Sequence, residues 1–311
     1  MSAKKLRGNI LLSLTAIIWG SAFVAQSLGM SYIGPFTFNA VRSIIGGIVL
    51  IPCIFLFDRI NKRCPPEDPT ERKAQRKVLL TGGIACGIVL GIASSLQQVG
   101  ISYTTAGKAG FITALYIVLV PVLGIFLKRR VSWPVWLGVA LAIGGLYLLC
   151  INEEFRIGIG DFYVLLCAFF FAVHIMIIDH FSPRVDGVRM SCIQFFIAGL
   201  LSMIPMFLFE TPRLSDIGAG ILPILYAGVL SSGVAYTLQI IGQKDLNPTA
   251  AALIMSMESV VAVISGWLVL KEAFTAKELI GCVLMFVAII LAQLPDQNQN
   301  TASVKKPSKS A

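Results

Sequence analysis

Residues 247–272 read NPTAAALIMSMESVVAVISGWLVLKE, and this stretch decides the class of protein. About twenty of its residues suit a lipid environment, and they are interrupted by one acid, Glu258. Asn247 is a good N-cap and Pro248 suits the first helical position, so we expect a helix to start here. At 1.5 Å per residue, Glu258 lies roughly 15 Å along that helix, near the middle of a hydrocarbon layer about 30 Å thick.

A carboxylate at that depth needs a physical reason. Insertion scales assign an ionised group there a cost of about 2.5 to 3.5 kcal/mol, so such residues usually face a cavity or a partner. We therefore interpret Glu258 as part of a pathway across the membrane. The alternative is a protonated carboxylic acid that hydrogen-bonds a neighbouring helix.

The composition of the whole chain agrees with a membrane protein. Hydrophobic residues make up 56% of the 311 residues and charged residues only 13%, whereas soluble domains are about one quarter charged. The net charge of +9 lies mostly in short segments between apolar runs, which disfavours nucleic-acid binding. The seven cysteines contain no CxxC pair and mostly fall inside apolar runs. They predict no disulfide framework and no zinc site, and no metal or organic cofactor is implied.

Ten apolar runs are long enough, or nearly long enough, to cross a bilayer. We therefore expect an all-α integral membrane protein with ten transmembrane helices. The runs cover residues 9–28, 35–57, 78–98, 107–127, 134–151, 160–181, 190–209, 217–241, 248–270 and 277–294.

The distribution of positive charge predicts the orientation. Of the 25 Lys and Arg residues, nineteen fall in segments on one side of these helices and five on the other, and Arg42 lies within a span. Positive charge marks the cytoplasmic side. We expect a multi-pass protein of the cell (cytoplasmic) membrane with both termini in the cytoplasm. The polar tail at 295–311 has too few apolar residues for a core and is expected to be disordered.

The two halves of the chain repeat each other. GIASSLQQVG at 91–100 matches GVAYTLQIIG at 233–242 at five of ten positions, and Gly46 and Pro52 match Gly199 and Pro205 at a constant offset. We expect two five-helix repeats, residues 1–154 and 155–294. Because five is odd, the copies cross the membrane in opposite senses. Such inverted repeats are typical of secondary transporters, whose binding site lies near the midplane between the halves.

Arg42 lies within about one helical turn of the depth of Glu258. Two interpretations stay open. The residues form a permanent structural ion pair, or each engages an oppositely charged group of a zwitterionic substrate such as an amino acid.

Further polar and aromatic residues are candidates for the same pathway. His174 lies well inside a span and could carry protons, although a lone histidine on an aromatic helix often serves only packing. Polar residues at matching positions of the two repeats would suit a pseudo-symmetric cavity. The simpler explanation is that they form hydrogen bonds between helices. Aromatic residues would form cavity walls or serve only packing. The polar repeat mates are Gln97 with Gln239 and Thr113 with Ser256, and the aromatic candidates are Trp19, Tyr116 and Tyr236.

Four stretches together resemble the EamA-type branch of the drug/metabolite transporter superfamily. They are WGSAFV from Trp19, NAVRSIIGG around Arg42, TTAGKAGFITALYIVLVPVLG at 104–124 and SMESVVAVISGWLVLKEAFTAKELIG at 256–281. The resemblance covers about residues 8 to 294. It implies two inverted repeats, a central pathway lined by helices 1, 3, 4, 6, 8 and 9, and export of small metabolites, often amino acids.

The family's acidic residue in helix 9 falls on Glu258 and its helix 2 arginine on Arg42. Two positions depart from the family pattern. Ser259 stands where a proline often follows the acid, which puts the local bend in doubt. Lys128, Arg129 and Arg130 end the first half where an acid is common, in keeping with a cytoplasmic loop.

We therefore expect a secondary transporter that exports small organic metabolites, with amino acids as one candidate class, by alternating access. Its expected partners are a small-molecule substrate and the lipid bilayer; a homodimer stays open. We find no phosphate-binding loop, so we do not expect ATP to drive transport directly. Proton antiport through Glu258, with or without His174, is a hypothesis that rests on the buried titratable groups. The alternative is a flippase or carrier for lipid-linked or nucleotide-linked sugars.

An intramembrane enzyme is disfavoured because HExxH and GxSxG motifs are absent. The residues fix neither the substrate nor the direction.

Overall fold

The computed structural model describes residues 3–60, 68–128, 131, 133–150, 158–270 and 276–292. Every regular element in these residues is a helix, which confirms the predicted all-α class. Within the same residues, eight helical segments are long and apolar enough to cross a membrane. The chain is therefore a multi-pass membrane protein. The predicted disordered tail at 295–311 lies outside the described residues.

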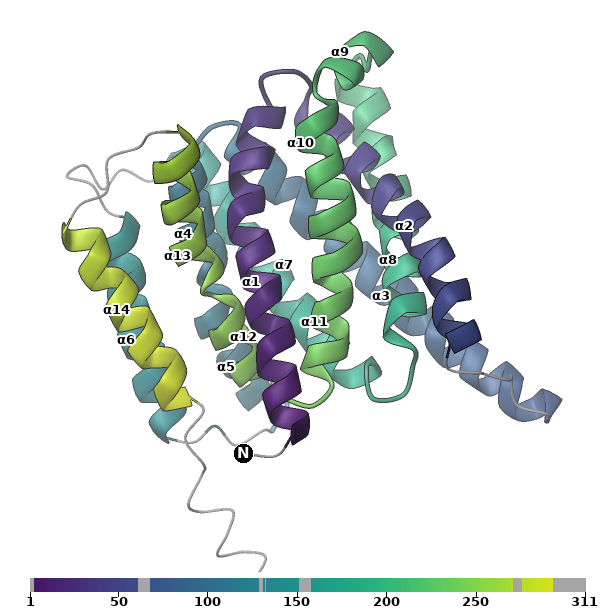
Figure 1. The fold of residues 1–311 in the computed structure, drawn as a ribbon, viewed down its shortest axis with the longest axis horizontal. Coiled ribbons are helices and arrows are strands. Elements are labelled where there is room, and N and C mark those ends of the chain that lie inside the picture. Colours follow the sequence, from purple (N-terminus) through teal and green to yellow (C-terminus); the bar gives the residue numbers. More distant parts are fainter. Residues whose placement is uncertain are drawn as a thin grey trace, which may run out of the picture.

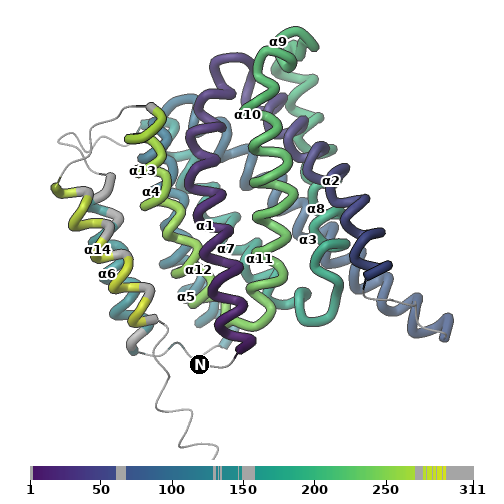
Figure 2. The backbone as a smooth tube through the Cα atoms, viewed as in Figure 1, coloured from purple at the N-terminus to yellow at the C-terminus, as the bar shows by residue number. Residues whose placement is uncertain are grey.

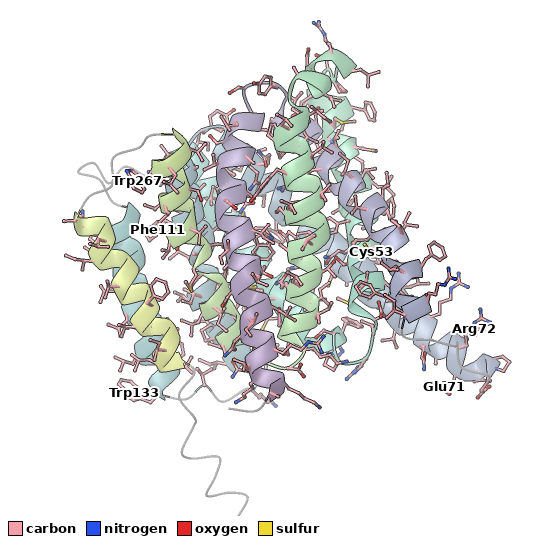
Figure 3. The ribbon with its side chains drawn as sticks, in the orientation of Figure 1. Cys53, Glu71, Arg72, Phe111, Trp133 and Trp267 are labelled. Atoms are coloured by element: carbon pink, nitrogen blue, oxygen red, sulfur yellow. The ribbon has the colours of Figure 1, made fainter. Side chains whose placement is uncertain are left out.

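The helices of the first half follow the predicted spans closely. α3 starts well before residue 78, and Figure 3 shows Glu71 and Arg72 on this extension beyond the other helices. Asp68 caps it by accepting a hydrogen bond from the Thr70 backbone N–H at 2.8 Å. The elements are α1 (Ala3–Gly29), α2 (Pro35–Ile60), α3 (Pro69–Ile101), α4 (Ala106–Ala114), α5 (Tyr116–Phe126) and α6 (Trp133–Cys150).

The second half contains more short elements because two of its spans are interrupted. The elements are α7 (Ile159–Phe181), α8 (Gly187–Phe209), α9 (Leu214–Ala219), α10 (Ile221–Leu225), the π-helix η1 (Tyr226–Ala235), α11 (Tyr236–Gln243), α12 (Pro248–Met255), α13 (Glu258–Ser265), the π-helix η2 (Gly266–Leu270) and α14 (Ala276–Ala292). The runs predicted at 134–151 and 277–294 contain helices whose apolar parts, Val135–Gly145 and Leu279–Ala288, are shorter. The count of ten spans therefore stays a prediction.

The helices pack in pairs that join the two halves of the chain. α2 lies along α8, α3 along α7 and α8, and α6 along α14 at one edge of the bundle (Figures 1 and 2). α1 packs against η1 and α11 on one side and against α12 and α13 on the other. The centre of the bundle is thus enclosed by helices from both halves.

Polar contacts hold α2 antiparallel to α8 at both ends. Glu210, at the end of α8, accepts hydrogen bonds from the backbone N–H groups of Phe36 at 2.8 Å and Thr37 at 2.7 Å. At the other end, Arg189 of α8 forms an ion pair with Asp58 of α2. A carboxylate at a helix N-terminus satisfies N–H groups that have no partner within the helix.

Two spans are broken near their middles. One is interrupted at Leu115, between α4 and α5, and the other at Ser256 and Met257, between α12 and α13. The second break needs no proline. The Ser256 hydroxyl donates to the Leu253 carbonyl at 2.8 Å and the Ser259 hydroxyl to the Ser256 carbonyl at 2.7 Å. Such bonds compete with the hydrogen bonds of the helical backbone. Ser259 therefore contributes to the irregularity itself.

Gly20 allows α1 to approach this break. A Cβ atom at Gly20 would lie 2.5 Å from the Glu258 carbonyl oxygen and 2.5 Å from the Val261 Cβ. Neither neighbour is the flexible end of a long side chain, so even an alanine would push α1 away from α13.

We predict that Gly20→Ala lowers the stability of the protein by about 1 to 3 kcal/mol, the usual cost of overpacking a well-packed site. Gly144→Ala is the matched control, because a Cβ there meets no heavy atom within 4 Å. It should be neutral or stabilising by up to about 1 kcal/mol, since alanine favours helix. Thermal unfolding of both variants in detergent measures the difference. An equal effect of the two changes would contradict the close packing at Gly20.

Candidate functional site

A small cavity lies at the centre of the bundle, where helices of both halves meet. Eight of the ten predicted site residues line it: Trp19, Arg42, Gln97, Thr113, Tyr116, Tyr236, Gln239 and Glu258. About 30 Å³ of it is open to the centres of water molecules, which is room for about two waters. The cavity is therefore closed around its polar groups in this conformation.

Arg42 reaches the cavity from α2 and is only 5% exposed. Its Nε–H donates to Asn39 Oδ1 at 3.0 Å, and its Nη1 donates to Gln26 Oε1 at 2.9 Å. The guanidinium carbon also lies 5.7 Å from the centroid of the Phe38 ring. Both hydrogen-bond acceptors are neutral amides, so they orient the guanidinium without neutralising its charge.

Glu258 enters the cavity from the first turn of α13 and is 3% exposed. Its Oε1 accepts a hydrogen bond from the Tyr116 hydroxyl at 3.0 Å. Tyr116 begins α5, so the hydrogen bond joins the two broken spans at their breaks. A helix N-terminus favours a negative group, and the break between α12 and α13 gives the carboxylate such a position.

No ion pair joins Arg42 to Glu258 in the described part of the chain, although both side chains line the same cavity. The Arg42 guanidinium is hydrogen-bonded to two amide oxygens and the Glu258 carboxyl group to a phenol. Two oppositely charged side chains that share a cavity without pairing can each bind an oppositely charged group of a ligand.

The walls combine aromatic surface with polar groups. The rings of Trp19 and Tyr236 are 4.5 Å apart between centroids, and Gln97 Nε2 donates to Thr113 Oγ1 at 3.2 Å. Trp19 Nε1 and Gln239 Oε1 are buried and have no hydrogen-bond partner among the residues that the structure describes. Buried polar atoms are normally satisfied, so this donor and this acceptor are suited to water or a ligand in the cavity.

Two predicted residues are absent from the cavity lining. Ser256 is fully buried at the helix break, where its hydroxyl bonds to Leu253. His174 is also fully buried; its Nε2 lies 3.1 Å from Gln194 Oε1, and its ring packs edge-on against Tyr236, with 6.0 Å between the centroids. His174 therefore lies behind the aromatic wall.

Sequence reasoning missed five lining residues: Phe23, Gln26, Phe171, Ile175 and Ser231. Gln26 lies two helical turns after Trp19, so its helical spacing and its polarity could have identified it. Phe171 and Ile175 share one helix face but cannot be told from packing residues. Ser231 lies in η1, and a π-helix has no sequence signal of this kind.

A second and larger space lies between α2, α3, α7 and α8, which we call the lateral groove. Its residues include Phe36, Ser95, Tyr103, Leu201 and Glu210, and about 840 Å³ of it is open to the centres of water molecules. Tyr103 is 67% exposed, so the groove faces outward from the bundle. Among the described residues, no group of three or more His, Cys, Asp or Glu side chains is placed to bind a metal ion.

The chain is similar along most of its length to curated proteins and to a solved structure. The chain is 32% identical over 297 residues to a protein of Archaeoglobus fulgidus named as an uncharacterized transporter, with 94% of this chain and 87% of that protein covered. It is 26% identical to the chloroplastic WAT1-related protein At3g02690 of Arabidopsis thaliana, with 90% and 68% covered. A solved crystal structure shares the fold with a TM-score of 0.72 at 18% identity, covering 96% of this chain and 99% of that one.

The model of the EamA-like transporter family matches this chain twice, at residues 6–151 and 158–294. Together these matches cover nearly all of the apolar part of the sequence, and the relatives named above extend over most of the same residues. The eight described membrane-crossing helices and the closed polar cavity agree with a membrane transporter. The chain belongs to the EamA-like transporter family.

Proposed function

We propose that this transporter exports small organic metabolites, amino acids among them, across the cytoplasmic membrane by alternating access. The observation that carries the proposal is that Arg42 and Glu258 line one cavity without pairing. A zwitterion supplies a carboxylate for Arg42 and an ammonium group for Glu258. Trp19 and Tyr236 then offer an aromatic surface to its side chain.

The proposed architecture is a pair of inverted five-helix repeats, residues 1–154 and 155–294. Helix pairing supports it, because α2 packs on its repeat mate α8 and α6 on its mate α14. In these repeats α1 corresponds to α7, and α3 corresponds to η1 with α11. The contact of α3 with α7 therefore has its counterpart in the contact of α1 with η1 and α11. Both helix breaks, at Leu115 and at Ser256–Met257, fall at corresponding positions of the two repeats.

Alternating access requires the closed cavity to open toward each side in turn. The broken spans α4–α5 and α12–α13 supply bending points near the cavity, since their helical ladders are already interrupted there. With both termini in the cytoplasm, as the distribution of Lys and Arg predicts, the Asp58–Arg189 pair lies toward the cytoplasm and Glu210 toward the outside. The cavity is formed within one chain, so each chain contains a complete candidate site.

We expect Glu258→Gln and Arg42→Gln each to lower export at least tenfold, because each removes a charge-assisted bond to substrate of about 1.5 to 3 kcal/mol. The measurement is an untargeted comparison of metabolites in the medium and cytoplasm of cells that express wild type or variant. Glu71→Gln is the control, because Glu71 is exposed on the extension of α3 (Figure 3). Export by the variants at the wild-type rate would place both charges in a structural role.

The coupling to protons gives a separate prediction. In proteoliposomes, transport should be faster when protons are concentrated on the side opposite the substrate, because antiport exchanges one for the other at Glu258. Glu258→Gln should remove this response. His174→Gln should retain it, because His174 lies behind Tyr236. Equal rates at pH gradients of opposite sign would rule out proton antiport.

A second candidate function is a flippase or carrier for a lipid-linked or nucleotide-linked sugar, and the lateral groove favours it. The groove combines apolar residues such as Leu201 with the hydroxyls of Ser95 and Tyr103, and it faces outward. An amphipathic substrate could lie there with its tail in lipid.

Reconstituted vesicles distinguish the two functions. We expect no acceleration of the flipping of a fluorescent lipid-linked sugar by wild type, and transport of a soluble metabolite that depends on Glu258. Flipping that survives Glu258→Gln but is blocked by Ser95→Trp, which fills the groove, would favour the second function instead.

A further inference from the structure

A buried cluster of polar side chains lies between the lateral groove and the central cavity. We call it the Asn39 cluster, and it consists of Asn39, Ser94, Ser95 and Ser202 from α2, α3 and α8. Asn39 is fully buried, and its Nδ2 lies 3.0 Å from Ser94 Oγ, 3.1 Å from Ser95 Oγ and 2.8 Å from Ser202 Oγ. Neither the repeat pattern nor the proposed substrate contacts account for this cluster.

The serines determine which way the Asn39 amide points. The Ser94 hydroxyl donates to the Leu90 carbonyl at 2.6 Å, and the Ser202 hydroxyl donates to the Ala198 carbonyl at 2.8 Å. A hydroxyl has only one hydrogen, so both oxygens can only accept from Asn39. The NH₂ group of Asn39 must therefore face the serines, and its carbonyl oxygen must face Arg42.

This orientation controls what Arg42 offers to the cavity. Asn39 Oδ1 accepts from Arg42 Nε at 3.0 Å and Gln26 Oε1 from Nη1 at 2.9 Å. A guanidinium has five N–H donors, so the others stay available at a side chain that lines the cavity. Because both acceptors are neutral, the positive charge remains uncompensated by them.

We propose that Asn39 is a positioning residue that holds Arg42 with its free N–H groups toward the cavity, and that its neutrality reserves the charge for a carboxylate-like group of the ligand. The proposal rests on the proposed function in one respect, that the central cavity is the substrate site. A buried aspartate in place of Asn39 would also accept from Arg42, with the serine hydroxyls turned to donate to its second oxygen. It would itself neutralise the charge of Arg42.

Hydrogen exchange at the Arg42 Nε–H tests the positioning without any ligand. The resonance of ¹⁵N-arginine-labelled protein in detergent is assigned by its loss in Arg42→Lys. We expect slow exchange in wild type, at least tenfold faster exchange in Asn39→Ala, and a smaller acceleration in Ser202→Ala. Thr15→Val is the control, because Thr15 is also buried and its hydroxyl contacts the carbonyl oxygens of Leu11 and Ala235. Equal exchange in wild type and Asn39→Ala would overturn the proposal.

A second measurement tests the role of the charge. L-Leucine is added as the probe, with L-leucinamide, which lacks the carboxylate, as its matched control. We expect the wild-type Arg42 resonance to shift with L-leucine alone. Asn39→Asp should keep the slow exchange but bind L-leucine at least tenfold more weakly, a loss typical of one charged hydrogen bond.

The outcomes separate the two claims. Wild-type affinity for L-leucine in Asn39→Asp would overturn the role assigned to the neutral amide. Slow exchange that depends on Asn39, with no wild-type response to L-leucine, would support the positioning and show that L-leucine is not a ligand of this cavity. Loss of slow exchange in the Thr15→Val control as well would show general loosening of the bundle, and would count against a specific role of Asn39.

Discussion

Arg42 and Glu258 are held by uncharged hydrogen-bond partners inside a bundle whose outer surface is largely apolar. Ionised groups at that depth are costly unless polar atoms surround them. The side-chain amides of Gln26 and Asn39 and the phenol of Tyr116 supply those atoms. The helices α1, α2, α5 and α13 must therefore meet at one point. Gly20 permits that meeting by letting α1 reach the backbone at Glu258. This close packing of α1 on α13 thus serves the placement of Glu258.

Irregular backbone gathers around the same cavity. Inside a membrane, such backbone is tolerated only where it is buried in protein or lines a polar cavity. The breaks at Leu115 and Ser256–Met257 carry Tyr116 and Glu258, and η1 carries Ser231. Each of these three departures from regular helix therefore places a polar group in the cavity, and also supplies a point where a span can bend. Binding and conformational change would then depend on the same few turns.

The sequence predicted the spans well because a membrane helix must be apolar over its whole length, as at 35–57 and 190–209. It also predicted the polar mates Gln97 and Gln239, which stand out in apolar runs. It did not predict that Asn39 holds Arg42, because α2 is apolar nearly all round and its sequence does not show which face points inward. The break at Ser256 was also obscured, since it depends on hydroxyl bonds to the backbone instead of a proline.

We propose that one closed cavity between the two halves opens to each side of the membrane in turn. Ser231 tests it most directly, because it lines the cavity and is only 3% exposed. In a variant whose native cysteines are replaced by alanine, Ser231→Cys is treated with a charged, membrane-impermeant thiol reagent from either face. We expect the reagent to modify Ser231→Cys from both faces, and a transported metabolite to slow the modification. Modification from one face only, or from neither, would contradict it.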